Sequence, residues 1–258
     1  NVLASVTNIV NNVNSIFEKD VAIRLELIAN TTDVFYSNSV TDPYTNGNVE
    51  ELIQENFFEM NLQFGADAFD IGHVFGTNTG GLANLGGVCD DDSKARGTSN
   101  TFGNYAGSLF YIIVAHEMGH QFNATHNFNF CDADNETWQT GYEPGAGSTI
   151  MCYSGASNCD NNWVQSVDDD YYHINAITRI RNFSRNPING GSCAEIETTD
   201  NTTPTASVNN ASGFFIPILT PFELTGEGSD DEDSDFLYNW EQYDAANVLA
   251  PYGNPMQN

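Results

Sequence analysis

Three histidines and one glutamate in a short segment are the strongest chemical signal in the sequence. The segment reads His116-Glu117-Met118-Gly119-His120-Gln121-Phe122-Asn123-Ala124-Thr125-His126. Residues four apart lie on one face of a helix, one turn apart, so His116 and His120 can bind one metal ion. Glu117 is rotated by about 100° from His116 and can reach a water in the open metal position without ligating the ion. These parts predict a zinc site with its own carboxylate base, as zinc-dependent hydrolysis of peptide bonds requires.

The third histidine constrains how the chain leaves this helix. His126 lies too far along to share the helix face if the helix continues, so the chain must turn after His120. A core helix that merely contains histidines is the alternative. Burying these polar groups without a metal would be costly, which makes that alternative the weaker one.

Helices and strands alternate around this segment. Apolar residues at helical spacing predict helices over about 2–17, 49–64 and 171–183, besides the apolar run 109–115 that leads into His116. Strands are expected at 21–27, at 70–75 and, flanked by glycines and at a sheet edge, at 82–88. This alternation indicates an α/β domain.

The composition changes near Thr198. We expect a catalytic domain over 1–197, a linker over 198–204, and a small β module or extension over 205–258. Within the module, apolar runs predict strands at 214–219, 221–224 and 236–240.

Charge and cysteine content limit the partners and the compartment. The 258 residues include 35 acidic and only 7 basic ones, for a formal net charge of −28, which would repel nucleic acid and anionic membrane surfaces. No apolar run approaches the roughly 20 residues that span a bilayer. Five cysteines beside this motif suggest an oxidising setting. We therefore expect a secreted, extracellular, monomeric protein with no nucleic-acid or membrane partner.

The histidine segment resembles the pattern His-Glu-x-x-His-x-x-Gly-x-x-His of the metzincin peptidases, with Asn123 in place of the glycine. In the family that glycine ends the helix in a left-handed conformation, and since asparagine is the commonest non-glycine residue in that conformation, the resemblance implies that Asn123 makes the turn. Ser148-Thr149-Ile150-Met151 resembles the methionine turn that lies beneath the zinc histidines of that clan. Two further stretches, 81–89 and 94–97, are similar to the reprolysin-like (adamalysin-type) branch, especially its secreted bacterial members. The likeness covers roughly residues 1–193, although the strand that precedes the first helix in the family is not found. Residues 220–226 and 238–242 resemble a β segment that often follows the bacterial domains.

The resemblance implies a fold and an activity. The fold is a twisted, mostly parallel sheet with an antiparallel edge strand and long helices, one of which carries the zinc site. The activity is that of a secreted zinc endopeptidase acting on proteins or peptides. Zinc would be held by the three histidines, Glu117 would be the general base, and Met151 would form the floor. Substrate would pair along the edge strand at Leu82, Ala83, Asn84 and Leu85.

The resemblance also suggests disulfides and a second catalytic group. It pairs Cys89 with Cys193 and Cys131 with Cys159, which leaves Cys152 as an unpaired thiol. Tyr153 stands where astacin-like and serralysin-like metzincins carry a tyrosine that can contact zinc or the tetrahedral intermediate. A partly buried structural tyrosine is the alternative reading of Tyr153, since adamalysins do not generally rely on one there.

Three acidic runs offer oxygen ligands of the kind that calcium prefers, at 90–92, 168–170 and 230–235. Solvated acidic turns are the alternative for each run. Two other functions stay open for the whole chain: a binding module that has lost activity on this scaffold, and a zinc hydrolase of another substrate class. Retention of Glu117 argues against the first, and the methionine turn and edge strand argue against the second.

Overall fold

The computed structural model describes residues 2–78, 80–103, 109–131, 140–208, 212–233 and 235–246. The chain forms two compact units, one of residues 1–194 together with 242–258 and the other of residues 195–241. We call them the first and the second unit. The domain boundaries expected at 197 and 204 stay a prediction. No helix in the described ranges is long and apolar enough to cross a bilayer.

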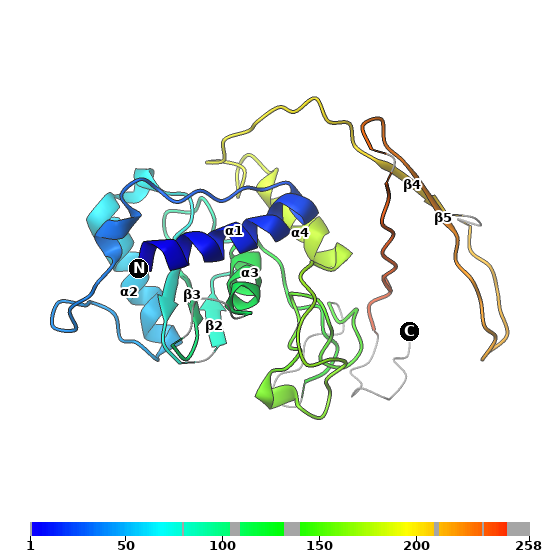
Figure 1. Cartoon of the computed structure of the whole chain (residues 1–258), viewed down its shortest axis with the longest axis horizontal. Coiled ribbons are helices and arrows are strands. Elements are labelled where there is room, and N and C mark those ends of the chain that lie inside the picture. The colour runs from blue at the N-terminus through cyan, green and yellow to red at the C-terminus, as the bar shows by residue number, and fades with distance from the viewer. Residues whose placement is uncertain are drawn as a thin grey trace. The chain divides into compact units, whose positions relative to one another are not determined.

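The first unit mixes helices with a small sheet (Figure 1), which confirms a mixed α/β class. Its α-helices are α1 (Val2–Val21), α2 (Val49–Phe64), α3 (Phe110–Gln121) and α4 (Ile174–Ser184), and its strands are β1 (Val74–Gly76), β2 (Gly80–Ala83) and β3 (Gly97–Asn100). Short 3-10 helices lie at Thr31–Val34, Ala66–Ala68 and Ser157–Cys159. The bounds of α2 agree with the helix predicted at 49–64. The Asn48 side chain accepts the backbone N–H groups of Glu50 and Glu51 and so stabilises the start of this helix.

The sheet is covered by helices on its two faces. Its order is β1-β3-β2, with β1 parallel and β2 antiparallel to β3. On one face Leu52 of α2 lies against Gly76, and on the other Glu117 of α3 lies against Gly81. An antiparallel strand at the edge agrees with expectation. A mostly parallel sheet is not confirmed, since the described sheet has one pairing of each kind.

Three of the strands predicted in the first unit differ from the structure, and the one expected at 70–75 begins only at Val74, as β1. Residues 21–27 do not form one: Val21 ends α1, Ala22 takes a φ of 56°, and the next residues run extended beside the helix. There the Asn14 side chain satisfies both the N–H and the C=O of Leu25, at 2.8 Å each, so the segment is held by a side chain instead of a neighbouring strand.

The strand expected at 82–88 is correct only at Leu82 and Ala83 and wrong from Asn84 on. It is β2, and it ends at Ala83. The chain turns at Gly86, with a φ of 67°, and the Gly86 N–H donates to the His120 carbonyl at 2.8 Å. The Val88 N–H likewise donates to the Gln121 carbonyl. This segment leaves the sheet because it satisfies carbonyls at the C-terminal end of α3, which have no partner within the helix.

The main core joins α1, α3 and α4 to the segment around Met151. Its largest fully buried side chains include Phe17, Ile16, Ile150, Met151 and Tyr172. The sequence 97–100, which forms β3, is buried as well, although none of its residues is apolar.

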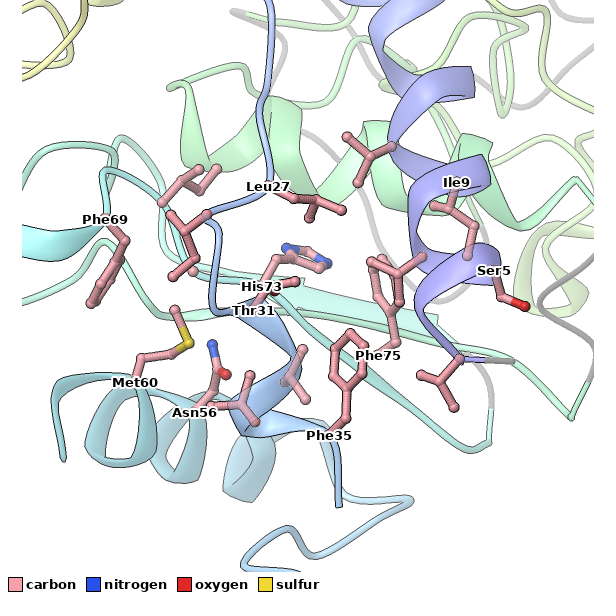
Figure 2. Close-up of a pocket in the computed structure, with 18 of the residues that line it drawn as sticks. Ser5, Ile9, Leu27, Thr31, Phe35, Asn56, Met60, Phe69, His73 and Phe75 are labelled. Carbon is pink, nitrogen blue, oxygen red and sulfur yellow. The ribbon is translucent and has the colours of Figure 1, made fainter. Parts of the chain in front are cut away.

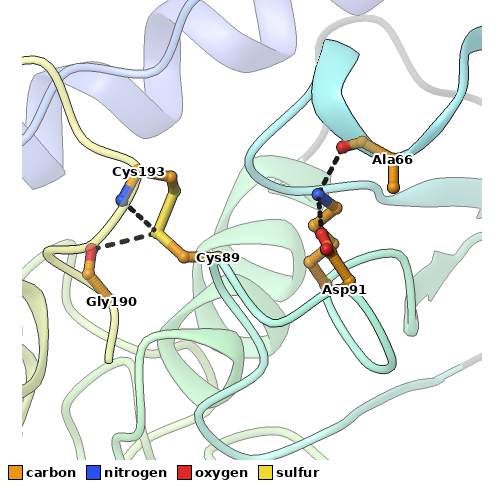
Figure 3. Close-up of a disulfide and its surroundings, with 6 residues drawn as sticks. Ala66, Cys89, Asp91, Gly190 and Cys193 are labelled. Atoms are coloured by element: carbon orange, nitrogen blue, oxygen red, sulfur yellow. Dashed lines mark hydrogen bonds and ion pairs between the residues drawn. A yellow bond between two sulfur atoms is a disulfide. The ribbon is translucent and has the colours of Figure 1, made fainter. Parts of the chain in front are cut away.

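Two disulfides tie loops to this unit, Cys89–Cys193 and Cys131–Cys159, the pairs that the resemblance suggests. Cys152 is a free, buried thiol. Near the first disulfide, the buried Lys94 ammonium donates to Asp91 at 2.6 Å and to the Ala66 carbonyl (Figure 3). That ion pair gives Asp91 a partner other than calcium.

The second unit contains a short antiparallel pair, β4 (Thr205–Val208) with β5 (Gly226–Ser229). The strands predicted at 214–219, 221–224 and 236–240 are therefore wrong. Pro217 and Pro221 lack a donor for a ladder, and the chain turns between them, with Leu219 at a φ of 61° and the Thr220 N–H bonded to the Pro217 carbonyl. The apolar residues of that stretch are largely exposed, so their pattern did not indicate a buried face.

Candidate metal centre

The helix α3 ends where the histidine motif requires a turn. The last helical residue is Gln121, and Asn123 takes a φ of 72°, which confirms the expected left-handed conformation. The Asn123 N–H donates to the His120 carbonyl, and Arg179 of α4 donates to the Asn123 carbonyl. An asparagine can thus end this helix as a glycine would, and the chain returns to bring His126 beside the helix.

The three histidine side chains converge on one point. Their Nε2 atoms lie 3.2 Å apart between His116 and His120, 3.2 Å between His116 and His126, and 3.1 Å between His120 and His126. Ligands of a tetrahedral zinc ion at 2.0–2.1 Å would be separated by about 3.3 Å. In the described part of the chain, these three are the one group of His, Cys, Asp or Glu side chains placed to share an ion.

Backbone carbonyls fix the orientation of two of the rings. His116 Nδ1 lies 2.6 Å from the Ile150 carbonyl, and His120 Nδ1 lies 2.7 Å from the Ala124 carbonyl. A carbonyl only accepts, so Nδ1 carries the proton in both rings and the Nε2 lone pair faces the centre. Burial, together with the neighbouring His120 and His126, holds the pKa of His116 well below its usual range. His116 is therefore prepared as a neutral metal ligand, two of the three rings are oriented by backbone carbonyls, and the donor set fits zinc.

Glu117 lies beside the histidines, buried against the edge strand. A Cβ added at Gly81 of β2 would come within 2.4 Å of Glu117 Cγ and 2.5 Å of its Oε1. Burial raises the pKa of Glu117 to about 8. A group that titrates near neutrality can both take and return a proton, as acid–base catalysis requires.

The predicted floor lies under the same helix. Met151 is fully buried, and a Cβ added at Gly119 of α3 would come within 2.7 Å of its sulfur. Tyr153 packs its ring against those of His126 and Phe128, with centroid separations of 4.7 and 4.6 Å. The structure therefore brings Glu117, Met151 and Tyr153 to the histidines. Leu82 and Ala83 lie in β2, the strand whose Gly81 adjoins Glu117. Asn84 and Leu85 follow β2, where the Asn84 N–H still donates to the Arg96 carbonyl.

The calcium prediction finds no support. In the run 90–92, Asp91 pairs with Lys94, while Asp90 accepts from Ser93 and from the Asp92 N–H. Asp168 accepts the Ser154 N–H, and burial raises its pKa to about 8. In the run 230–235, residue 234 lies outside the described residues. The described parts of the three runs form no shared site for an ion.

A cavity of about 520 Å³ lies elsewhere in the first unit (Figure 2). It is lined by α1, the segment after it, α2 and β1, with residues such as Ile9, Leu27, Met60 and Phe75. None of the three histidines lines it. The cavity is therefore distinct from the histidine cluster.

Two residues at the site escaped the sequence reasoning. Gly81 leaves room for the Glu117 side chain, and a glycine flanking the predicted edge strand was the available signal. Glu143 accepts hydrogen bonds from the segment that holds Met151. It is a single acidic residue in a loop, and no spacing in the sequence marks it.

Comparison with known proteins agrees with this geometry. Residues 1–182 match the family described as Metallo-peptidase family M12B, Reprolysin-like. A comparison with curated protein sequences gave no significant match. The matched range contains all three histidines, Glu117 and Met151.

Proposed function

The chain belongs to metallo-peptidase family M12B, reprolysin-like, and on that premise we propose that it is a secreted zinc endopeptidase with Glu117 as general base. The observation that carries the proposal is the convergence of three Nε2 atoms within 3.2 Å of one another beside a buried glutamate. His116, His120 and His126 would hold the zinc ion. Bound there, zinc would supply Lewis-acid chemistry that activates water and polarises a peptide carbonyl, and its charge would lower the pKa of Glu117.

The chain's own groups account for the proton transfers. Glu117 would accept a proton from the attacking water and return it to the leaving amine, which makes it both base and acid. The carbonyls of Ile150 and Ala124 keep the ligand rings in the tautomer that leaves Nε2 free. Tyr153 is a candidate for a second catalytic group, and its packing on His126 equally suits a structural role.

We propose that substrate binds as an extra strand along β2. This strand is at the edge of the described sheet, and Gly81 within it adjoins Glu117. Exposed edge amides and carbonyls bind extended peptides through main-chain hydrogen bonds. A protein or peptide would thus be presented next to the base.

The two disulfides support secretion, since such bonds persist in oxidising compartments.

Substitution of Glu117 tests the proposal. We expect Glu117→Ala to abolish hydrolysis of casein while zinc stays bound, because the glutamate is not a ligand. His126→Ala is the contrasting control, since it should lose both zinc and activity. A fully active Glu117→Ala variant would refute the assignment.

A chelator separates the alternatives. Casein hydrolysis that a zinc chelator stops, and added zinc restores, supports a peptidase. Zinc binding without any hydrolysis of casein would favour the binding module or a hydrolase of another substrate class.

A further inference from the structure

A buried carboxylate lies behind the metal centre, outside the set of ligand and base. Glu143 is only 7% exposed. Its Oε2 accepts the Ser148 N–H at 2.8 Å, the Ser148 hydroxyl at 3.1 Å and the Thr149 N–H at 3.1 Å. Its Oε1 accepts the Thr149 hydroxyl at 2.5 Å and the Cys152 thiol at 3.0 Å. A buried carboxylate is stable only when donors surround it, and here every one of these donors comes from residues 148–152.

The two residues between these donors, Ile150 and Met151, contact His116 and the backbone next to His126. The Ile150 carbonyl accepts from His116 Nδ1 at 2.6 Å. The Met151 carbonyl accepts the N–H of Asn127, the residue after His126, at 3.0 Å. The donors to Glu143 thus lie on both sides of these two carbonyls. A shift of the carboxylate would therefore move the carbonyls that contact the ring of His116 and the backbone beside His126.

Backbone hydrogen bonds from elsewhere also hold the same segment. The Ile150 N–H donates to the Tyr171 carbonyl at 3.1 Å, and the Ser148 carbonyl accepts the Asp169 N–H at 2.8 Å. Neither contact is charged. Loss of the Glu143 carboxylate should therefore loosen the segment without unfolding it.

We propose that Glu143 is a positioning residue of the metal centre, which holds residues 148–152 so that the Ile150 carbonyl orients His116 towards the ion. The inference rests on the proposed zinc site and deepens it. Glu143 does not contact the ion, the substrate or the reacting atoms. It acts through the Ile150 carbonyl, and its effect should be seen first in the affinity for zinc.

The test measures zinc affinity of the zinc-free protein by competition with a chelator. Substitution of groups that orient metal ligands weakens binding by about 10–100-fold, and we expect Glu143→Gln to weaken it about 10-fold because the uncharged contacts remain. The matched control is Glu59→Gln on α2. Glu59 is 8% exposed and hydrogen-bonded to Tyr36 and Gln63, so it tests the loss of a buried carboxylate away from the histidines.

A purely structural role would lower the melting temperature of both variants and leave zinc affinity unchanged in both. That result would overturn the inference, whereas weaker binding in Glu143→Gln alone supports it. Cobalt(II) in place of zinc gives a second readout, because its visible absorption reports ligand orientation and should shift only in the Glu143 variant.

A milder variant decides the question if Glu143→Gln does not fold. Thr149→Val keeps the shape of the side chain and removes the hydroxyl that donates to Oε1. We expect zinc affinity to fall by a few-fold, and unchanged affinity would contradict the inference. Zinc binding by a wild-type protein that hydrolyses no casein would count against the proposed function alone, since the effect of Glu143 on zinc would still be measurable.

Discussion

The substitution Gly81→Ala, which adds a methyl group, should impair catalysis and leave metal binding unchanged. In Gly81→Ala the new Cβ would lie 2.4 Å from Glu117 Cγ and 2.5 Å from Oε1. Carbon atoms in contact are ordinarily about 3.5–4.0 Å apart, so the glutamate or the edge strand must move by about 1 Å. A misplacement of that size can lower a catalytic rate about 100-fold. We expect kcat/KM for a quenched fluorescent peptide to fall by about that factor.

Zinc affinity should stay at the wild-type value in Gly81→Ala, because the three ligand rings are held by other contacts. The Ile150 and Ala124 carbonyls that orient two of the rings are not in β2. Zinc content and affinity, measured on the same preparations as the kinetics, check this part. Weaker zinc binding in parallel with the loss of activity would point to a general distortion of the site.

A double-mutant cycle isolates the clash itself. Overpacking a buried site costs about 1–3 kcal/mol, so Gly81→Ala should lower the free energy of unfolding by about that amount. In a Glu117→Ala background the atoms that the methyl group would strike are gone, and the same substitution should cost much less. An equal cost in both backgrounds, or full activity of Gly81→Ala, would refute the reasoning.

Two further predictions concern neighbouring residues. Tyr153→Phe keeps the ring that packs on His126, so an unchanged kcat would remove its hydroxyl from the mechanism, while a loss of about 10-fold or more would support a catalytic role. Asp168 has its pKa raised from 3.8 to about 8 by burial, so between those pH values the folded chain keeps a proton that the unfolded chain has lost, and stability falls as pH rises. Asp168→Asn removes this dependence, so its melting temperature relative to wild type should rise from about pH 5 to about pH 8. A difference that is constant with pH would contradict this expectation.

The helices and the metal ligands could be predicted because their signals are local. His116 and His120 share a helix face by periodicity alone, and the caps and apolar spacing of α2 lie within its own sequence. The left-handed turn at Asn123 was likewise predictable, since only a few residue types tolerate that conformation.

The strands were harder, because their stability depends on distant partners. β3 contains glycine, threonine, serine and asparagine, yet it is fully buried between β1 and β2. The Thr98 hydroxyl finds a partner inside, because it donates to Asn100 Oδ1. Conversely, residues 21–27 alternate as a strand would, but the described structure satisfies Leu25 through Asn14 of α1. Hydrophobic alternation could indicate neither outcome.

The supporting residues of the site were the least predictable. Glu143 and Gly81 matter through contacts with residues far along the chain or across the sheet, and neither is marked by spacing. Chemistry-bearing residues can be recognised by type and interval. The groups that hold them in place are recognised only once the distances are known.

The return of the chain to the first unit has a consequence for its covalent topology. Tyr243 stacks on Tyr142, the Gln242 carbonyl lies 3.0 Å from His173 Nε2, and the Ala246 N–H donates to the Gly141 carbonyl. On the other side of residues 195–241, Cys193 is bonded to Cys89. The second unit is therefore an insertion, fastened to the same body at both of its ends. A single proteolytic cut within it would leave the C-terminal fragment attached to the first unit by non-covalent contacts alone, such as the stacked rings of Tyr243 and Tyr142, because Cys89 and Cys193 both precede the cut. Such a cut would keep residues 242–246 in the protein, whereas ending the chain at residue 197 would remove them and uncover His173, whose side chain caps α4.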